Sequence, residues 1–258
     1  MGKSFTLILI SLFTLVANAQ DSLCVFKIKG VALAKFDKAK KPIKKGDILN
    51  EKNTVYLNST SNLTLINSDG KVFNLESTGA YDYSDILKNE HLENQKGLTS
   101  RYFKMIWKEL TNKDAGKTII GGVFRGDVFM EFPLDSARIA SSKIKFKWKA
   151  DESISEYYVF IKDSNSDDVH KFATNGNELT LYKDNPIFSG SKSFEWAVST
   201  KEFPNLKNIP FYTFTLINRS EYESLKSQFD DLISDLEAIG LSSIEIEETL
   251  CNTYGICK

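Results

Sequence analysis

The side chains best able to do chemistry are three cysteines and two histidines. Cys251 and Cys257 flank a short segment that contains Gly255, and glycine allows such a loop to turn back on itself. In an oxidising compartment the two cysteines could form a local disulfide. Cys24 would then be free, or it would pair with one of the other two instead.

The histidines do not complete a metal site or a hydrolase triad. His91 and His170 lie far from the cysteines in the sequence, and structural zinc normally takes four ligands. Neither is accompanied by a nucleophile in a recognisable elbow motif. We therefore predict no catalytic residue, no metal ligand and no cofactor, and we expect no enzyme activity. A carbohydrate-active enzyme is an alternative to a non-enzymatic protein, because the paired carboxylates of such an enzyme meet in space and leave no sequence pattern.

Two fragments resemble known binding loops, and each lacks an essential residue. Gly116-Lys117-Thr118 ends like a phosphate-binding loop, but Thr111 stands where that motif requires its first glycine. The segment Asp163–Asp168 has oxygen ligands at calcium-loop spacing, yet its sixth residue is not glycine and Thr174 replaces the terminal glutamate. We interpret the first as part of a polar linker and the second as a polar hairpin loop.

The first residues have the pattern of a cleavable export signal. A single cation, Lys3, precedes an apolar run from about Phe5 to Val16, and Ala17-Asn18-Ala19 provides a small-residue cleavage site. The run is shorter than the roughly 20 residues that span a bilayer. We predict a signal peptide over residues 1–19 and an exported mature chain that is periplasmic, outer-membrane-associated or secreted, with no membrane span after cleavage.

The charges of the chain are nearly balanced. Removal of the signal takes away Lys3 alone, which leaves 32 of the 33 cations against 34 acids. Proteins that bind nucleic acid or acidic lipid surfaces carry a concentrated positive charge, so this balance argues against either as the main partner. The lysines around Lys38–Lys45 form a local basic cluster, which we interpret as a solvated loop between strands.

Strand patterns dominate the chain and predict a mainly β fold with helical additions. From Val25 to Ser77 short runs alternate in polarity, and Asp69-Gly70 separates two of them. An Asp-Gly pair between such runs indicates a hairpin, because both turn residues must accept positive φ.

Residues 25–80 resemble a FecR-type β domain. The matching segments are Gly30-Val31, Ile43–Leu49, Thr54–Leu57 and Ser61–Leu75, which includes a leucine-rich strand, Asp-Gly and a further strand. The resemblance implies a small extracytoplasmic β domain over residues 22–83. The regulator role of well-known members needs a cytoplasmic segment and a membrane span, so that role is not carried over.

Residues 84–116 change to a helical period and are predicted to form a helical connector. Ser84 can cap a first helical piece, and Gly97 separates it from a second. The second piece places an aromatic and aliphatic stripe on one face, which we expect to be buried against a neighbouring domain. Its members are Leu98, Tyr102, Phe103, Ile106, Trp107 and Leu110.

Residues 117–218 are predicted to form a β-sandwich. Lys143–Lys149 alternates without a fault, so Ile144, Phe146 and Trp148 share the buried face. The order of Pro133-Leu134-Asp135, Phe146-Lys147-Trp148 and Tyr157–Ile161 is similar to immunoglobulin-like or fibronectin type III modules of bacterial surface proteins. No cysteine pair lies inside this segment, unlike in antibody domains.

Residues 219–258 are predicted to form a C-terminal helical hairpin. Ser220 with Glu223, and Ser242 with Glu245, have the spacing of capping boxes, and Gly240 stands where a helix stop is expected. Together these patterns predict an exported, non-enzymatic binding or scaffolding protein of the bacterial cell envelope, with an envelope protein or a glycan as its partner. An alternative is an accessory subunit of an envelope complex that docks through its C-terminal helices. The sequence leaves the oligomeric state open.

Overall fold

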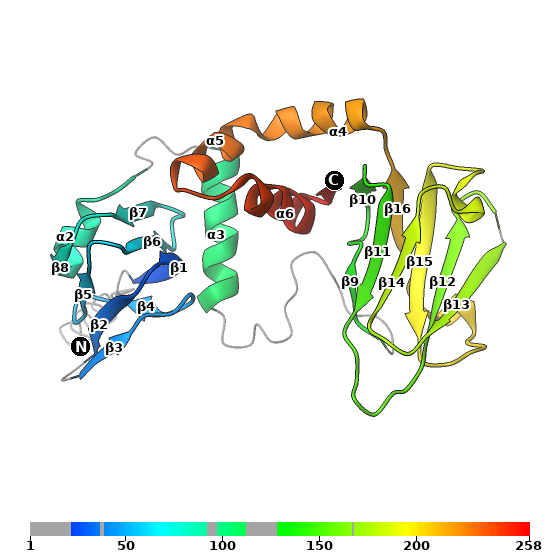
Figure 1. The fold of residues 1–258 in the computed structure, drawn as a ribbon, viewed down its shortest axis with the longest axis horizontal. Coiled ribbons are helices and arrows are strands. Elements are labelled where there is room, and N and C mark those ends of the chain that lie inside the picture. Colours follow the sequence, from blue (N-terminus) through cyan, green and yellow to red (C-terminus); the bar gives the residue numbers. More distant parts are fainter. Residues whose placement is uncertain (1–21, 37–38, 92–96, 112–127, 167) are drawn as a thin grey trace, which may run out of the picture. The chain divides into compact units, whose positions relative to one another are not determined.

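The computed structural model describes residues 22–36, 39–91, 97–111, 128–166 and 168–258 (Figure 1). The expected signal peptide and the segment Gly116-Lys117-Thr118 lie outside these ranges. The described residues contain 17 strands in four sheets together with several helices, which confirms the mainly β fold with helical additions. The chain divides into two compact units, one ending at Thr111 and one beginning at Asn112.

The first unit is built from two four-stranded sheets. One has the order β4-β1-β6-β7 and the other the order β3-β2-β5-β8. Their bounds are β1 Leu23–Lys29, β2 Ala32–Phe36, β3 Ala39–Pro42, β4 Ile48–Leu49, β5 Thr54–Leu57, β6 Asn62–Asn67, β7 Val72–Leu75 and β8 Gly79–Tyr81. Alternate apolar side chains of both sheets enter one common core. The burial of the apolar residues that alternate in the sequence therefore stabilises this unit.

The Asp69-Gly70 hairpin is confirmed. β6 and β7 pair in antiparallel fashion, but of the two turn residues only Gly70, with a φ of 77°, has the positive φ that was expected of both. A Cβ at Gly70 would lie 2.5 Å from the carbonyl oxygen of Ser100, which belongs to helix α3, Leu98–Thr111. Glycine is therefore required here both for the turn and for the close approach of this helix.

The interpretation of the basic cluster as a loop between strands is confirmed for Lys44 and Lys45, which lie between β3 and β4, and is wrong for Lys40 and Lys41. Ala39–Pro42 forms the exposed edge strand β3, which pairs with β2 so that Lys40 lies opposite Lys35. The Lys40 ammonium also lies 3.5 Å from the centre of the Tyr56 ring. Lysines on an edge strand remain solvated while their backbone pairs, which is why their sequence has the polarity of a loop.

Two helices complete the first unit. α2, Tyr83–Leu87, is capped by Asp82, whose side chain accepts from the amide of Asp85, so the cap is Asp82 and not Ser84. In α3 the side chains of Tyr102 and Phe103 are buried, and the Phe103 ring meets Phe26 of β1 edge-on at 5.3 Å. No helix among the described residues is long and apolar enough to cross a membrane.

The second unit contains a six-stranded and a three-stranded sheet (Figure 1). The larger has the order β13-β12-β15-β16-β10-β17 and the smaller the order β14-β11-β9. Their bounds are β9 Met130–Phe132, β10 Ala137–Ile139, β11 Lys143–Trp148, β12 Tyr157–Asp163, β13 Val169–Thr174, β14 Glu178–Tyr182, β15 Ser193–Ser199, β16 Tyr212–Leu216 and β17 Ile256–Cys257. Short 3-10 turns occupy Pro186–Phe188 and Leu206–Asn208.

The alternation predicted for β11 is confirmed. Ile144, Phe146 and Trp148 are fully buried, and the lysines between them are exposed. From the opposite sheet, the Trp196 ring meets Phe146 at 5.2 Å and its indole nitrogen donates to the carbonyl oxygen of Pro133 at 3.2 Å. Aromatic packing between the two sheets thus forms the core of this unit.

The C-terminal region has more breaks than a simple hairpin. α4, Arg219–Lys226, leads through the 3-10 turn Ser227–Phe229 into α5, Asp230–Ala238, and α6 spans Ser243–Tyr254. The capping box of α4 is formed by Asn218 and Glu221, two residues before the expected pair, whereas the box of Ser242 and Glu245 is confirmed. Gly240 follows α5 with a φ of 79°, as expected of a helix stop.

The chain ends in a strand. β17 runs parallel to β10 at the edge of the larger sheet, with Ile256 opposite Arg138 and Cys257 opposite Ile139. The amide of Ala140 donates to the carbonyl oxygen of Cys257 at 2.8 Å. Ile256 also packs with Ile217 and Tyr222, so the start of α4 and the last strand share one small apolar cluster.

Candidate functional site

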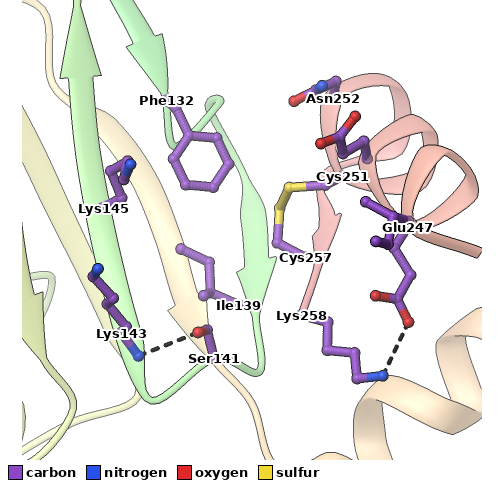
Figure 2. Close-up of a pocket in the computed structure, with 12 residues that line it drawn as sticks. Phe132, Ile139, Ser141, Lys143, Lys145, Glu247, Cys251, Asn252, Cys257 and Lys258 are labelled. Atoms are coloured by element: carbon purple, nitrogen blue, oxygen red, sulfur yellow. Dashed lines mark hydrogen bonds and ion pairs between the residues drawn. A yellow bond between two sulfur atoms is a disulfide. The ribbon is translucent and has the colours of Figure 1, made fainter.

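A hollow of about 280 Å³ lies within the second unit, between the edges of its sheets and helix α6 (Figure 2). One wall comes from strands β9, β10 and β11, and the other from α6 and β17. The lining residues are Phe132, Ile139, Ser141, Lys143, Lys145, Ile244, Glu247, Glu248, Cys251, Asn252, Cys257 and Lys258.

The two cysteines singled out from the sequence form part of this wall. Cys251 and Cys257 are joined by a disulfide, with their Cα atoms 4.4 Å apart. Cys257 is buried in the core of the sandwich, and Cys251 at the end of α6 packs against that core. The bond therefore fixes the end of α6 beside the sheet and holds the hollow in shape. Cys24 is a free cysteine buried in the first unit.

The charged side chains of the hollow belong to its two sides. On the helix side, Lys258 pairs with Glu247 at 2.9 Å. On the sheet side, Lys145 pairs with Glu178 of β14 at 3.4 Å, at the outer face of the sheet. Among the described residues the side chain of Lys143 has no acidic partner. Figure 2 shows Lys143 and Lys145 along one strand and the Glu247–Lys258 pair across the hollow from them.

Apolar groups form the floor and part of the helix wall. Phe132 is half-buried and Ile139 is buried, and both pack on the sandwich core beside the disulfide. Ile244 on α6 is 68% exposed, which leaves an aliphatic side chain at the rim. The hollow thus combines an apolar floor with charged edges, a composition suited to recognising a polypeptide or a small amphipathic ligand.

The other candidate groups lie elsewhere. His91 follows α2, and its amide donates to the carbonyl oxygen of Val72 of β7 in the first unit, while His170 is exposed on β13 in the second. Asp163 at the end of β12 accepts from the amide of Asn165, so its carboxylate stabilises the turn that follows. The described residues contain no group of three or more His, Cys, Asp or Glu side chains placed to hold a metal ion.

The carboxylates of the hollow, Glu247 and Glu248, are successive residues of α6. They point about 100° apart around the helix, and Glu247 is engaged by Lys258.

Sequence reasoning found the disulfide partners but missed Phe132, Lys143 and Lys145 as site residues. For Lys143 and Lys145 the only signal was the alternation of β11, which predicts an exposed face without saying which helix lies beside it, and Phe132 on β9 had no such signal.

No protein-family model matches the chain, and no curated protein matches its sequence. The resemblances to FecR-type and immunoglobulin-like domains therefore rest on the residues and strand patterns described above.

Proposed function

We propose that this protein is an exported, non-enzymatic binding or scaffolding protein of the bacterial cell envelope. The observation that carries the proposal is the disulfide between Cys251 and Cys257, which builds one wall of the hollow. Structural disulfides persist in oxidising compartments outside the cytoplasm. The signal pattern over residues 1–19 provides the route to such a compartment.

Strand order supports an immunoglobulin-like assignment for the second unit. With β9 and β10 taken as two halves of a split first strand, the smaller sheet holds the equivalents of strands A, B and E. The larger sheet holds the equivalents of C, F and G, with β13 as an added edge strand. The buried tryptophans Trp148 and Trp196 stand on the equivalents of B and F instead of C, which is a departure from the antibody pattern.

A rigid hollow at the side of such a sandwich supports recognition of an envelope partner. Its walls come from strands and a helix, and elements of this kind hold a binding surface more firmly than loops do. The exposed Ile244 on α6 favours a second candidate, an accessory subunit that docks through its C-terminal helices.

Deletion of residues 219–258 would be a poor test, because it also removes β17 and the buried side chains of Ile256 and Cys257. Photo-crosslinking amino acids placed singly at Lys143 and Ile244 are sharper probes, with Lys207 of the turn between β15 and β16 as the control. We expect the chain in the envelope or secreted fraction with its disulfide formed. We also expect protein or glycan adducts from the two hollow positions and none from Lys207.

Adducts from Ile244 alone would favour docking through the C-terminal helices. A chain that stays in the cytoplasm with Cys251 and Cys257 reduced would contradict the proposed function. Adducts that form equally from all three positions would contradict a specific binding surface.

A further inference from the structure

Strand β11 has a strand partner along only part of one edge. Its ladder with β14 runs from Lys143 to Lys147. On the other edge β9 pairs only at Lys147 and Trp148, after which the chain leaves for the larger sheet as β10. The part of β11 before Lys147 is therefore open on the side where β9 would continue, and this side faces the hollow that Lys143 and Lys145 line.

The direction of the backbone groups follows from the hydrogen bonds toward β14. The carbonyl oxygen of Ser142 accepts from Lys183, and the amide of Trp148 donates to Asn177. Peptide groups alternate in direction along a strand, so those of Lys143 and Lys145 point to the open edge.

One of these four backbone amide and carbonyl groups has a hydrogen-bond partner nearby in the chain. The Lys143 amide donates to the Ser141 hydroxyl at 3.1 Å. The amide and carbonyl of Lys145 have no hydrogen-bond partner among the described residues. An unpaired donor and acceptor on a strand edge form a template for another strand.

Side-chain chemistry at this edge defines what a pairing strand would carry. On the outer face, Glu131 of β9 lies 3.3 Å from Lys147 and supplies that lysine with an acid. Where β9 ends, Lys145 and Lys143 form no ion pair with an acid on this flank among the described residues, and the acids of the facing wall are Glu248 and Glu247, of which Glu247 pairs with Lys258. On the inner side of the edge lie the apolar groups of Phe132 and Ile139.

We infer that the open edge of β11 binds an extended segment of a partner protein in which acidic and apolar residues alternate. The segment adds as a strand in line with β9, antiparallel to β11. Its backbone pairs with Lys145, its acidic side chains lie beside Lys143 and Lys145, and its apolar side chains enter the hollow. This inference rests on the proposed binding function and names the chemistry of the partner.

A labelled, capped eight-residue peptide of alternating glutamate and valine is the probe, and fluorescence anisotropy measures its binding to the full mature chain. A peptide with lysine in place of glutamate is the charge control. Two further versions carry N-methyl groups on alternate amides, one version for each of the two phases. Because a paired strand turns only one set of amides toward β11, we expect one phase to abolish binding and the other to preserve it.

The protein variant K143E/K145E tests the charges. We expect its affinity for the glutamate peptide to fall roughly tenfold or more. The matched control K201E/K207E has the same change in net charge on exposed lysines of the β15–β16 connection, and it should bind as the unaltered protein does. Circular dichroism verifies that both variants are folded, and the N-methylated peptides test the pairing without any variant.

Equal binding of both N-methylated versions, or equal loss in both double variants, would overturn the inference. A dimer in sedimentation that K143E/K145E dissociates would show that a second copy occupies the edge, which also overturns it. If the peptide does not bind while Lys143 still crosslinks in the envelope, strand addition is wrong and the binding function stands. If the peptide binds as expected but the chain is retained in the cytoplasm, the envelope role is wrong and the edge chemistry stands.

Discussion

The disulfide between Cys251 and Cys257 joins helix α6 to strand β17 across the left-handed turn at Gly255. The same strand is held from its other side by parallel pairing with β10. Strand β17 is therefore fixed by the covalent bond at Cys257 and by the backbone ladder of Ile256 and Cys257 with β10. Because the disulfide also lines the hollow, the stability of this corner determines the shape of the candidate site.

Reduction of this disulfide is expected to lower the free energy of unfolding by about 2 kcal/mol, the value for closing a loop of this length in the unfolded chain. Urea denaturation of the mature protein with and without reductant measures the change. The double variant C251A/C257A is the control and should not respond to reductant. An unchanged midpoint for the reduced unaltered protein would contradict the prediction.

Gly255 and Gly240 allow the cost of a left-handed backbone to be distinguished from the cost of a steric clash with a neighbouring strand. Gly255 and Gly240 have φ values of 66° and 79°, but a Cβ at Gly255 would lie 3.3 Å from the Cα of Ala137, whereas Gly240 has open space around it. Both Gly→Ala variants carry the cost of a left-handed residue, about 1–2 kcal/mol. We expect Gly255→Ala to cost about 1 kcal/mol more in thermal or urea unfolding. Equal losses would show that β10 moves aside freely.

Features with a local period could be predicted from the sequence. β11 alternates because its inner side chains fill the sandwich core while its lysines face water, and the hairpin at Asp69-Gly70 follows from the demand for positive φ. Both depend on residues that are neighbours in the chain.

Features set by distant pairing could not be predicted. β17 has two residues and no period, and it is a strand only because β10 lies beside it. β3 has the composition of a loop, and its pairing with β2 decides otherwise. The open edge of β11 depends on where β9 ends, which no residue of β11 encodes.

The two buried tryptophans of the sandwich differ in one hydrogen bond. Trp196 donates to the carbonyl oxygen of Pro133, whereas the indole N–H of Trp148 has no acceptor among the described residues. Trp196→Phe leaves a buried carbonyl unpaired, but Trp148→Phe removes an unpaired donor. We expect Trp196→Phe to lower the free energy of unfolding by about 1–3 kcal/mol more than Trp148→Phe, as measured by urea denaturation. The opposite order would contradict this account of the core.

Cys24 is expected to be unreactive in the folded protein. It is fully buried in β1, and burial, reinforced by the charge of Asp47, raises the pKa of its thiol from the ordinary 9.0 to about 11. At pH 8 roughly one thiol in a thousand is then ionised. A disulfide reagent that detects thiols should find almost none in the native protein and one equivalent in denaturant. Rapid native labelling at pH 8 would contradict this burial.

The same pKa shift predicts how Cys24 affects stability at alkaline pH. The folded state binds the thiol proton more tightly than the unfolded state. The contribution of the Cys24 thiol to the free energy of unfolding is therefore fully present below pH 9 and is lost as the pH rises toward about 11. Unfolding free energies measured across that window should therefore fall more steeply for the unaltered protein than for Cys24→Ala. The Cys24→Ala variant is the control, because it keeps every other ionisable group of the protein. Parallel curves for the two proteins would show that the thiol does not contribute.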